Sequence, residues 1–128
     1  MGVGVAGTVG PVIIIAATLD YADQQSRDEA VLASTPVQWA TRQAEPGCHA
    51  YCFAADPAVP TRIQVYELWE DDASLAAHFV HANYDQMRAV LGTFGITGAW
   101  NRMYLVEKNE PVYGPDSTIR STFFVAEG

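Results

Sequence analysis

The sequence predicts an α+β domain of the ferredoxin-like class, with the element order β-α-β-β-α-β. Three observations support this order: a β-branched apolar run near the start, two short alternating segments in the middle, and two stretches with helical spacing of apolar residues. This order forms one four-stranded antiparallel sheet with two helices on one face. The 128 residues are 49% hydrophobic, which is enough to build one core without disulfides.

The first strand and the first helix occupy the first third of the chain. Residues 11–19 form a short run rich in Ile and Val, which predicts a strand buried on both faces. Residues 20–23 predict a polar turn. Residues 24–44 carry apolar side chains three and four apart, the period of a helix face. Because Pro36 lacks a backbone donor, we expect a kink there, or a split with Thr35 capping a second helix.

A hairpin follows the helix. Residues 48–54 and 61–69 each predict a strand, and the two prolines of residues 56–60 predict the loop between them. In the second of these strands, alternation places Glu67 and Trp69 on one face and Tyr66 on the other.

The last helix and the last strand complete the order. The acidic residues 70–72 suit a helix N-terminus, and residues 73–91 then predict one helix with a bend at residues 83–84. Residues 92–98 predict a loop, and residues 99–107 alternate as a fourth strand.

The domain organisation follows from these elements. We expect a flexible N-terminal tail over residues 1–10, the ferredoxin-like domain over 11–108, and a C-terminal extension over 109–128. Residues 119–125 could form a terminal strand, with the extension packing on a partner chain. One face of the sheet lacks helices, and a second copy of the chain is the simplest cover for an apolar face. The sequence therefore predicts a homodimer.

Charge and hydropathy exclude several classes of partner. The formal net charge is -8 and Lys and Arg do not cluster, so neither nucleic acid nor an anionic membrane is an expected partner. Residues 1–19 lack the basic start of a secretory signal, and the apolar run is shorter than a membrane span of about 20 residues. The expected location is the cytoplasm.

The cysteines and histidines give weak signals for chemistry. Cys48 and Cys52 lie roughly 13 Å apart along a strand, too far for a disulfide, and are interpreted as small core residues. His78 and His81 form an H-x-x-H pair without the Glu of the metalloprotease signature, so no metal site is expected. His49 is either a pocket base or a histidine at the sheet edge, and the edge is favoured.

Aromatic and polar residues recur on the elements that would border the space between sheet and helices. Packing in the core explains most of them. The more specific hypothesis is that they line a pocket for a flat apolar ligand. The residues are Tyr51, Tyr66, Trp69, His78, Tyr84, Trp100 and Tyr104.

Three segments are similar to motifs of the antibiotic biosynthesis monooxygenase family. They are residues 45–51 (EPGCHAY), 65–71 (VYELWED) and 75–79 (LAAHF), which match the family's Glu-x-Gly-Cys turn, its Glu-x-Trp-Glu strand end and its Leu-x-x-His helix. The resemblance spans residues 11–107. It implies a dimeric α+β barrel built from two ferredoxin-like chains, in agreement with the element order and with the dimer argument.

The resemblance also implies a function. Such proteins oxidise a small aromatic or quinol with molecular oxygen as co-substrate, without a metal or another cofactor. The substrate itself reduces oxygen, once the protein has bound the substrate away from water and removed a proton from it. By this analogy His78 is the catalytic residue, and Trp69, Tyr66, Asn83 and Tyr51 bind substrate. Asn83 stands where the family often has a second His.

Other functions occur on the same fold. The haem-degrading branch has an Asn on the first strand and a Trp near the position of His78, and this chain has neither. A non-catalytic small-molecule-binding protein and a polyketide isomerase, decarboxylase or cyclase stay open as alternatives, because fold does not fix function. Oxygen consumption separates these alternatives from a monooxygenase.

Overall fold

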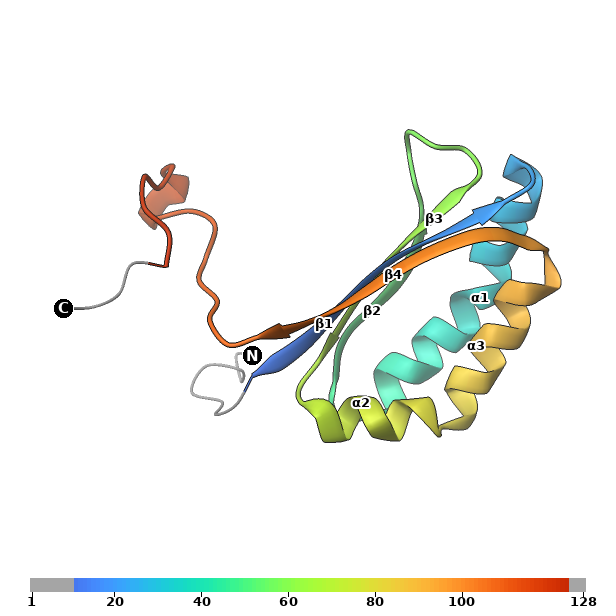
Figure 1. Ribbon diagram of the computed structural model, residues 1–128, viewed down its shortest axis with the longest axis horizontal. Helices are drawn as coiled ribbons and strands as arrows, with labels where there is room; N and C mark the ends of the chain where they lie inside the picture. Colours follow the sequence, from blue (N-terminus) through green and yellow to red (C-terminus); the bar gives the residue numbers. More distant parts are fainter. Residues whose placement is uncertain (1–10, 125–128) are drawn as a thin grey trace.

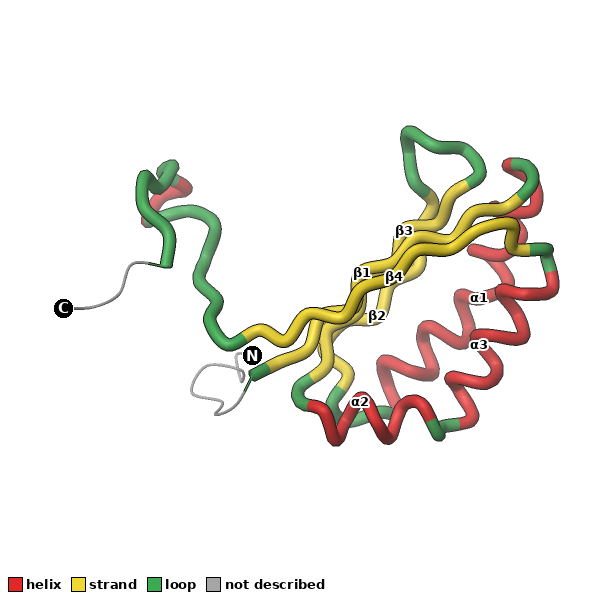
Figure 2. Tube along the Cα trace, viewed as in Figure 1, coloured by secondary structure: helices red, strands yellow, loops and turns green. Residues whose placement is uncertain are grey.

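The sheet has the strand order expected of a ferredoxin-like fold. In the computed structural model, which describes residues 11–124, the order is β2-β3-β1-β4 and each neighbouring pair is antiparallel. The strands are β1 (Val12–Tyr21), β2 (Cys48–Ala55), β3 (Arg62–Trp69) and β4 (Ile96–Val106). All three helices cover one face of the sheet, as Figures 1 and 2 show: α1 (Gln24–Ala44), α2 (Asp72–Phe79) and α3 (Ala82–Thr93). The predicted α+β class and strand topology are confirmed.

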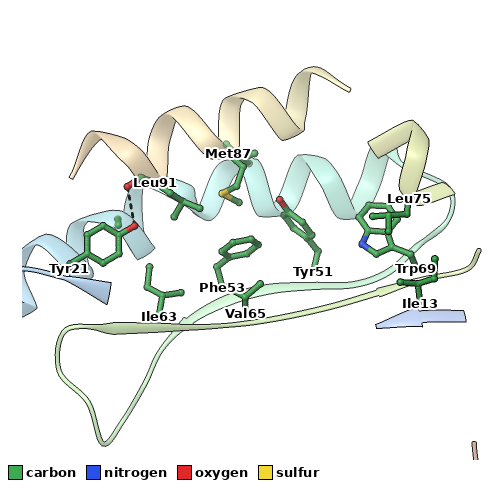
Figure 3. Packing of buried hydrophobic residues seen from close by; sticks show 12 residues of the cluster. Ile13, Tyr21, Tyr51, Phe53, Ile63, Val65, Trp69, Leu75, Met87 and Leu91 are labelled. Carbon is green, nitrogen blue, oxygen red and sulfur yellow. Dashed lines mark hydrogen bonds between the residues drawn. The ribbon is translucent and has the colours of Figure 1, made fainter. Parts of the chain in front are cut away.

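The central strand β1 is longer and less buried than predicted. Only Ile13 and Tyr21 are fully buried in it, because helices cover one face of the sheet and not the other. The polar turn predicted at residues 20–23 is wrong for Asp20 and Tyr21, which belong to β1. The Tyr21 hydroxyl donates to the Leu91 carbonyl at 3.0 Å, a bond drawn in Figure 3, and so ties this strand end to α3.

Helix α1 runs through Pro36 without a break, so the predicted split is wrong. Thr35 does not cap a new helix, since its hydroxyl donates to the Val31 carbonyl at 2.9 Å. Pro36 lies on the exposed side of α1, where water can replace the backbone partner that Leu32 loses. The helix begins after Asp23, whose carboxylate accepts from the Ser26 amide at 2.8 Å.

The single helix predicted over residues 73–91 is two helices. The break falls at residues 80–81, before the predicted bend. His81 is the N-cap of α3, and its Nδ1 atom accepts from the Asn83 amide at 2.9 Å. Asp71 caps α2 as predicted, accepting from the Ser74 amide at 2.8 Å.

The last strand begins earlier than predicted, and no strand follows it in the described extension. The predicted loop shrinks to residues 94–95, where Gly95 takes a positive φ of 82°. Beyond β4, Figure 1 shows the chain projecting away from the sheet and helices. Within residues 119–124 the predicted terminal strand is wrong, because the only pairing there is one bridge between Tyr113 and Ile119. The tail predicted over residues 1–10 lies outside the described residues.

The core lies between the sheet and the helices. Figure 3 shows aromatic and aliphatic side chains from β2 and β3 meeting Met87 and Leu91 of α3. Its largest fully buried hydrophobic side chains are Trp69, Tyr51 and Ile63. No helix in residues 11–124 has the length and apolar character of a membrane span.

Candidate active site

A cavity of about 330 Å³ lies between the inner face of the sheet and helices α2 and α3. Aliphatic and aromatic side chains form most of its wall. A small number of polar groups interrupt this wall, which is the usual composition of a site for a small organic ligand. They come from Tyr51, Glu67, His78, Tyr84, Arg88 and Asn101.

His78 is the buried base candidate of this cavity. It stands in the last turn of α2, and only 1% of it is exposed. Its Nδ1 atom lies 2.8 Å from Oε1 of Glu45, a buried residue directly after α1. In the neutral imidazole, a proton on Nδ1 donates to this carboxylate and leaves Nε2 as an acceptor. Nε2 makes no hydrogen bond to any residue in the range 11–124.

The Glu45 carboxylate is itself fixed in place. Its second oxygen, Oε2, accepts from Nδ2 of Asn83 at 3.1 Å. His81 lies farther away, with Nδ1 3.9 Å from the same oxygen. A carboxylate bonded at both oxygens holds the imidazole in one orientation, as the third residue of a catalytic triad does.

Aromatic rings enclose the imidazole of His78. The Trp69 ring is tilted by 34° to it with centroids 4.5 Å apart, and Tyr51 and Tyr84 meet it edge-on, each at 5.4 Å. Trp69 is fully buried and does not border the cavity. Trp69 therefore supports His78 from behind, while Tyr51 and Tyr84 present surface to a ligand.

Glu67 is a second buried carboxyl group on the cavity wall. Its Oε1 atom accepts from Nε1 of Trp69 at 2.9 Å. Burial raises the pKa of Glu67 to about 7; the Trp69 bond opposes this rise and the charge of Glu45 adds to it. Glu67 thus exchanges a proton near neutral pH, which suits acid–base work. Burial also raises the pKa of Tyr51, so its phenol stays protonated.

The predicted site residues fall into three groups. His78 and Tyr51 line the cavity. Trp69 and Asn83 lie one layer behind it, against His78 and Glu45 respectively. Tyr66 is 45% exposed on the opposite face of the sheet and does not reach the cavity.

Two carboxyl groups of the site were not predicted. Glu67 had a usable signal, because alternation in β3 places it beside Trp69 on the inner face. Glu45 is the first residue of the Glu-x-Gly-Cys motif, but no sequence pattern indicates its contact with His78, which lies 33 residues further along the chain.

The remaining candidates lie away from the cavity. His49 is exposed on the edge strand β2, with Nε2 3.6 Å from Glu70, which favours the sheet-edge interpretation. His81 points to Glu45 and solvent, and residues 11–124 contain no group of three or more His, Cys, Asp or Glu that could hold a metal. Cys48 and Cys52 are free and half-buried, and burial raises the pKa of the Cys48 thiol to about 11.

Comparison with known families agrees with this geometry. The sequence model of the antibiotic biosynthesis monooxygenase family matches residues 13–90. The chain belongs to this family. The match includes both strands of the hairpin, all of α2 and most of α3, and therefore Glu45, Glu67 and His78.

Solved structures of the family share the fold of this chain. A candidate antibiotic biosynthesis monooxygenase from Deinococcus radiodurans superposes with a TM-score of 0.70 at 20% identity, covering 80% of this chain and 99% of its own. A second, from Caulobacter crescentus CB15, gives 0.66 at 18% identity, covering 84% and 98%. No protein with curated information matches the sequence.

Proposed function

We propose that the protein is a cofactor-independent monooxygenase that oxidises a small aromatic or quinol substrate with O₂. The observation that carries this proposal is the buried Glu45–His78 pair at the wall of a mostly apolar cavity. Membership in the antibiotic biosynthesis monooxygenase family supports the reaction class. The substrate itself supplies the electrons.

The proposed reaction begins at Nε2 of His78, which removes a proton from the bound substrate. One electron then passes from the substrate anion to O₂, and the two radicals combine to form a carbon–oxygen bond. The peroxide loses water: its O–O bond breaks, one oxygen stays as a carbonyl and the other leaves. For an activated CH₂ group the sum is CH₂ + O₂ → C=O + H₂O, and the substrate provides all four electrons.

The protein contributes charge stabilisation, a proton donor and the exclusion of water to these reaction steps. Glu45 stabilises the imidazolium that His78 becomes. Glu67 lines the cavity wall and has a pKa of about 7, so below neutral pH it carries the proton that the departing oxygen needs. Apolar residues such as Phe53 and Leu91 keep water from the reactive anion.

A polyketide isomerase, decarboxylase or cyclase is the second candidate, because His78 would serve equally as its base. An oxygen electrode with a panel of anthrones and hydroquinones separates the two. We expect one O₂ consumed per product, and a loss of about 10²–10⁴-fold in His78→Gln, whose amide can still donate to Glu45 and so retain the fold. Absence of uptake with every tightly bound aromatic would leave the isomerase class or a non-catalytic binding protein.

We also propose that two copies of the chain pair through the helix-free face of the sheet. Tyr66, Trp100 and Tyr104 lie on this face and are each 45–48% exposed. Monomers rarely leave a cluster of large aromatic side chains in water. A second copy would cover this face and form the α+β barrel.

A further inference from the structure

The chain beyond β4 folds into a small unit of its own, which we call the C-terminal hook (residues 109–124). Oε1 of Glu110 accepts from Nη2 of Arg120 at 2.8 Å and from the Phe124 amide at 2.7 Å. A single β-bridge joins Tyr113 to Ile119. These contacts give the hook a defined shape.

The hook leaves its apolar side chains in water. Within residues 11–124, the hydrogen bonds and the ion pair of the hook all stay inside it. A unit of this size, well below about 40 residues, cannot bury a core of its own. Five apolar side chains are between 53% and 89% exposed: Val112, Tyr113, Ile119, Phe123 and Phe124. Such a cluster marks a surface that packs against a partner.

The position of the hook points to a second copy of the chain as that partner. Figure 1 shows the hook beyond the end of β4, on the side of the sheet opposite to the helices. The cavity and the helices of the same chain lie on the other side. The hook therefore projects toward the side of the helix-free face, on which Trp100 and Tyr104 of β4 are exposed. A second copy packed on that face, as proposed above, would lie beside the hook.

Two-fold symmetry would cover both hooks with one kind of contact. In a symmetric pair each hook meets the same surface of the other chain, so the contact forms twice. The bonds of Glu110 hold the hook in shape before pairing, which lowers the entropy lost on association. The hook lies outside residues 13–90, the part that matches the family, so family membership does not imply this contact.

We infer that the C-terminal hook is an interaction surface for a second copy of this chain, which it contacts through Val112 and Ile119. These two are the most exposed of its apolar side chains. The inference rests on the proposed dimer and adds a second contact to the one between the helix-free faces. It is independent of the proposed oxidation.

Sedimentation velocity over a dilution series tests the inference. Val112→Asp/Ile119→Asp replaces two apolar side chains that support no other part of the described chain. We expect the dimer dissociation constant to rise at least about 100-fold, because each apolar side chain that is no longer buried costs roughly tenfold or more in affinity. Ser121→Asp/Thr122→Asp adds the same charges at exposed polar positions of the hook and should dimerise as wild type.

A photo-cross-linker identifies the surface that the hook contacts. With p-benzoyl-phenylalanine in place of Ile119, irradiation should give a covalent dimer on a denaturing gel. The same group in place of Leu32, an exposed residue of α1, should not. A cross-link confined to one chain would show that the hook folds back on its own body, and would overturn the inference.

Three sedimentation results would also overturn it. If Val112→Asp/Ile119→Asp dimerises as wild type, the hook has no part in pairing, while the contact between helix-free faces stands. Equal weakening in both variants assigns the effect to charge and not to apolar contact. A monomeric wild-type protein contradicts both the hook contact and the proposed dimer, whereas oxygen uptake tests the oxidation separately. Circular dichroism confirms that each variant is folded.

Discussion

Oε1 of Glu45 lies 2.8 Å from Nδ1 of His78, and both side chains are almost completely buried. The pair joins the residue after α1 to the last turn of α2. Truncating one member of a buried charged pair leaves the other without a partner, which is costly to stability. Substitutions that keep shape and change charge are therefore the informative ones.

Glu45→Gln keeps the side-chain volume and removes the charge that stabilises the protonated imidazole. We expect turnover to fall about 10²-fold, the low end of what a general base contributes, with the secondary structure unchanged. Oxygen uptake under saturating substrate measures the effect. Glu29→Gln, at an exposed position of α1, is the matched control and should behave as wild type. Equal rates in the two variants would remove Glu45 from the mechanism.

Glu67 should make the protein less stable as pH rises. Its pKa is about 7 in the folded protein and 4.5 when unfolded, so the folded state retains a proton that the unfolded state loses between these values. The free energy of unfolding should then fall by about 3 kcal/mol from pH 4.5 to pH 7 and level off above.

Glu67→Gln isolates this contribution, since its amide oxygen can still accept from Trp69. Urea unfolding of both proteins between pH 5 and pH 8 gives the difference in the free energy of unfolding at each pH. The variant should gain stability relative to wild type as pH rises. A difference that is constant with pH would show that Glu67 does not carry a raised pKa.

A feature of this site can be predicted from the sequence when the residues that make it are close together along the chain. Alternation in β3 correctly places Glu67 and Trp69 on one face, because the two-residue repeat of a strand is local. The break before α3 was missed because it depends on the side chain of His81 capping the amide of Asn83. Glu45 was missed because its contact with His78 is purely tertiary.

The ends of the helices and strands show the same difference between local patterns, which the sequence reveals, and tertiary packing, which it does not. The order of strands and helices follows from hydrophobic periodicity, which the core enforces. Pro36 was expected to split α1, yet buried residues of that helix, such as Val37 and Thr41, hold it on the sheet beyond the proline. Packing of a helix face outweighs one lost backbone bond.

The helix-free face of the sheet should control assembly. Trp100→Glu/Tyr104→Glu places two negative charges where the proposed partner packs, so we expect a monomer by sedimentation velocity. Leu32→Glu changes an exposed residue of α1 on the far side of the molecule and should leave the dimer intact. A wild-type protein that sediments as a monomer at micromolar concentration would contradict the dimer directly.

Trp69→Phe tests whether Glu67 acts as the acid. The phenyl ring keeps an aromatic surface against His78 but cannot donate to Oε1 of Glu67. Because that hydrogen bond lowers the pKa of Glu67, its loss should raise the pKa above about 7. If protonated Glu67 delivers the proton to the departing oxygen, the alkaline limb of the pH profile of kcat should move to higher pH. In Glu67→Gln that limb should be absent altogether, and a limb that stays in place in both variants would assign it to another group.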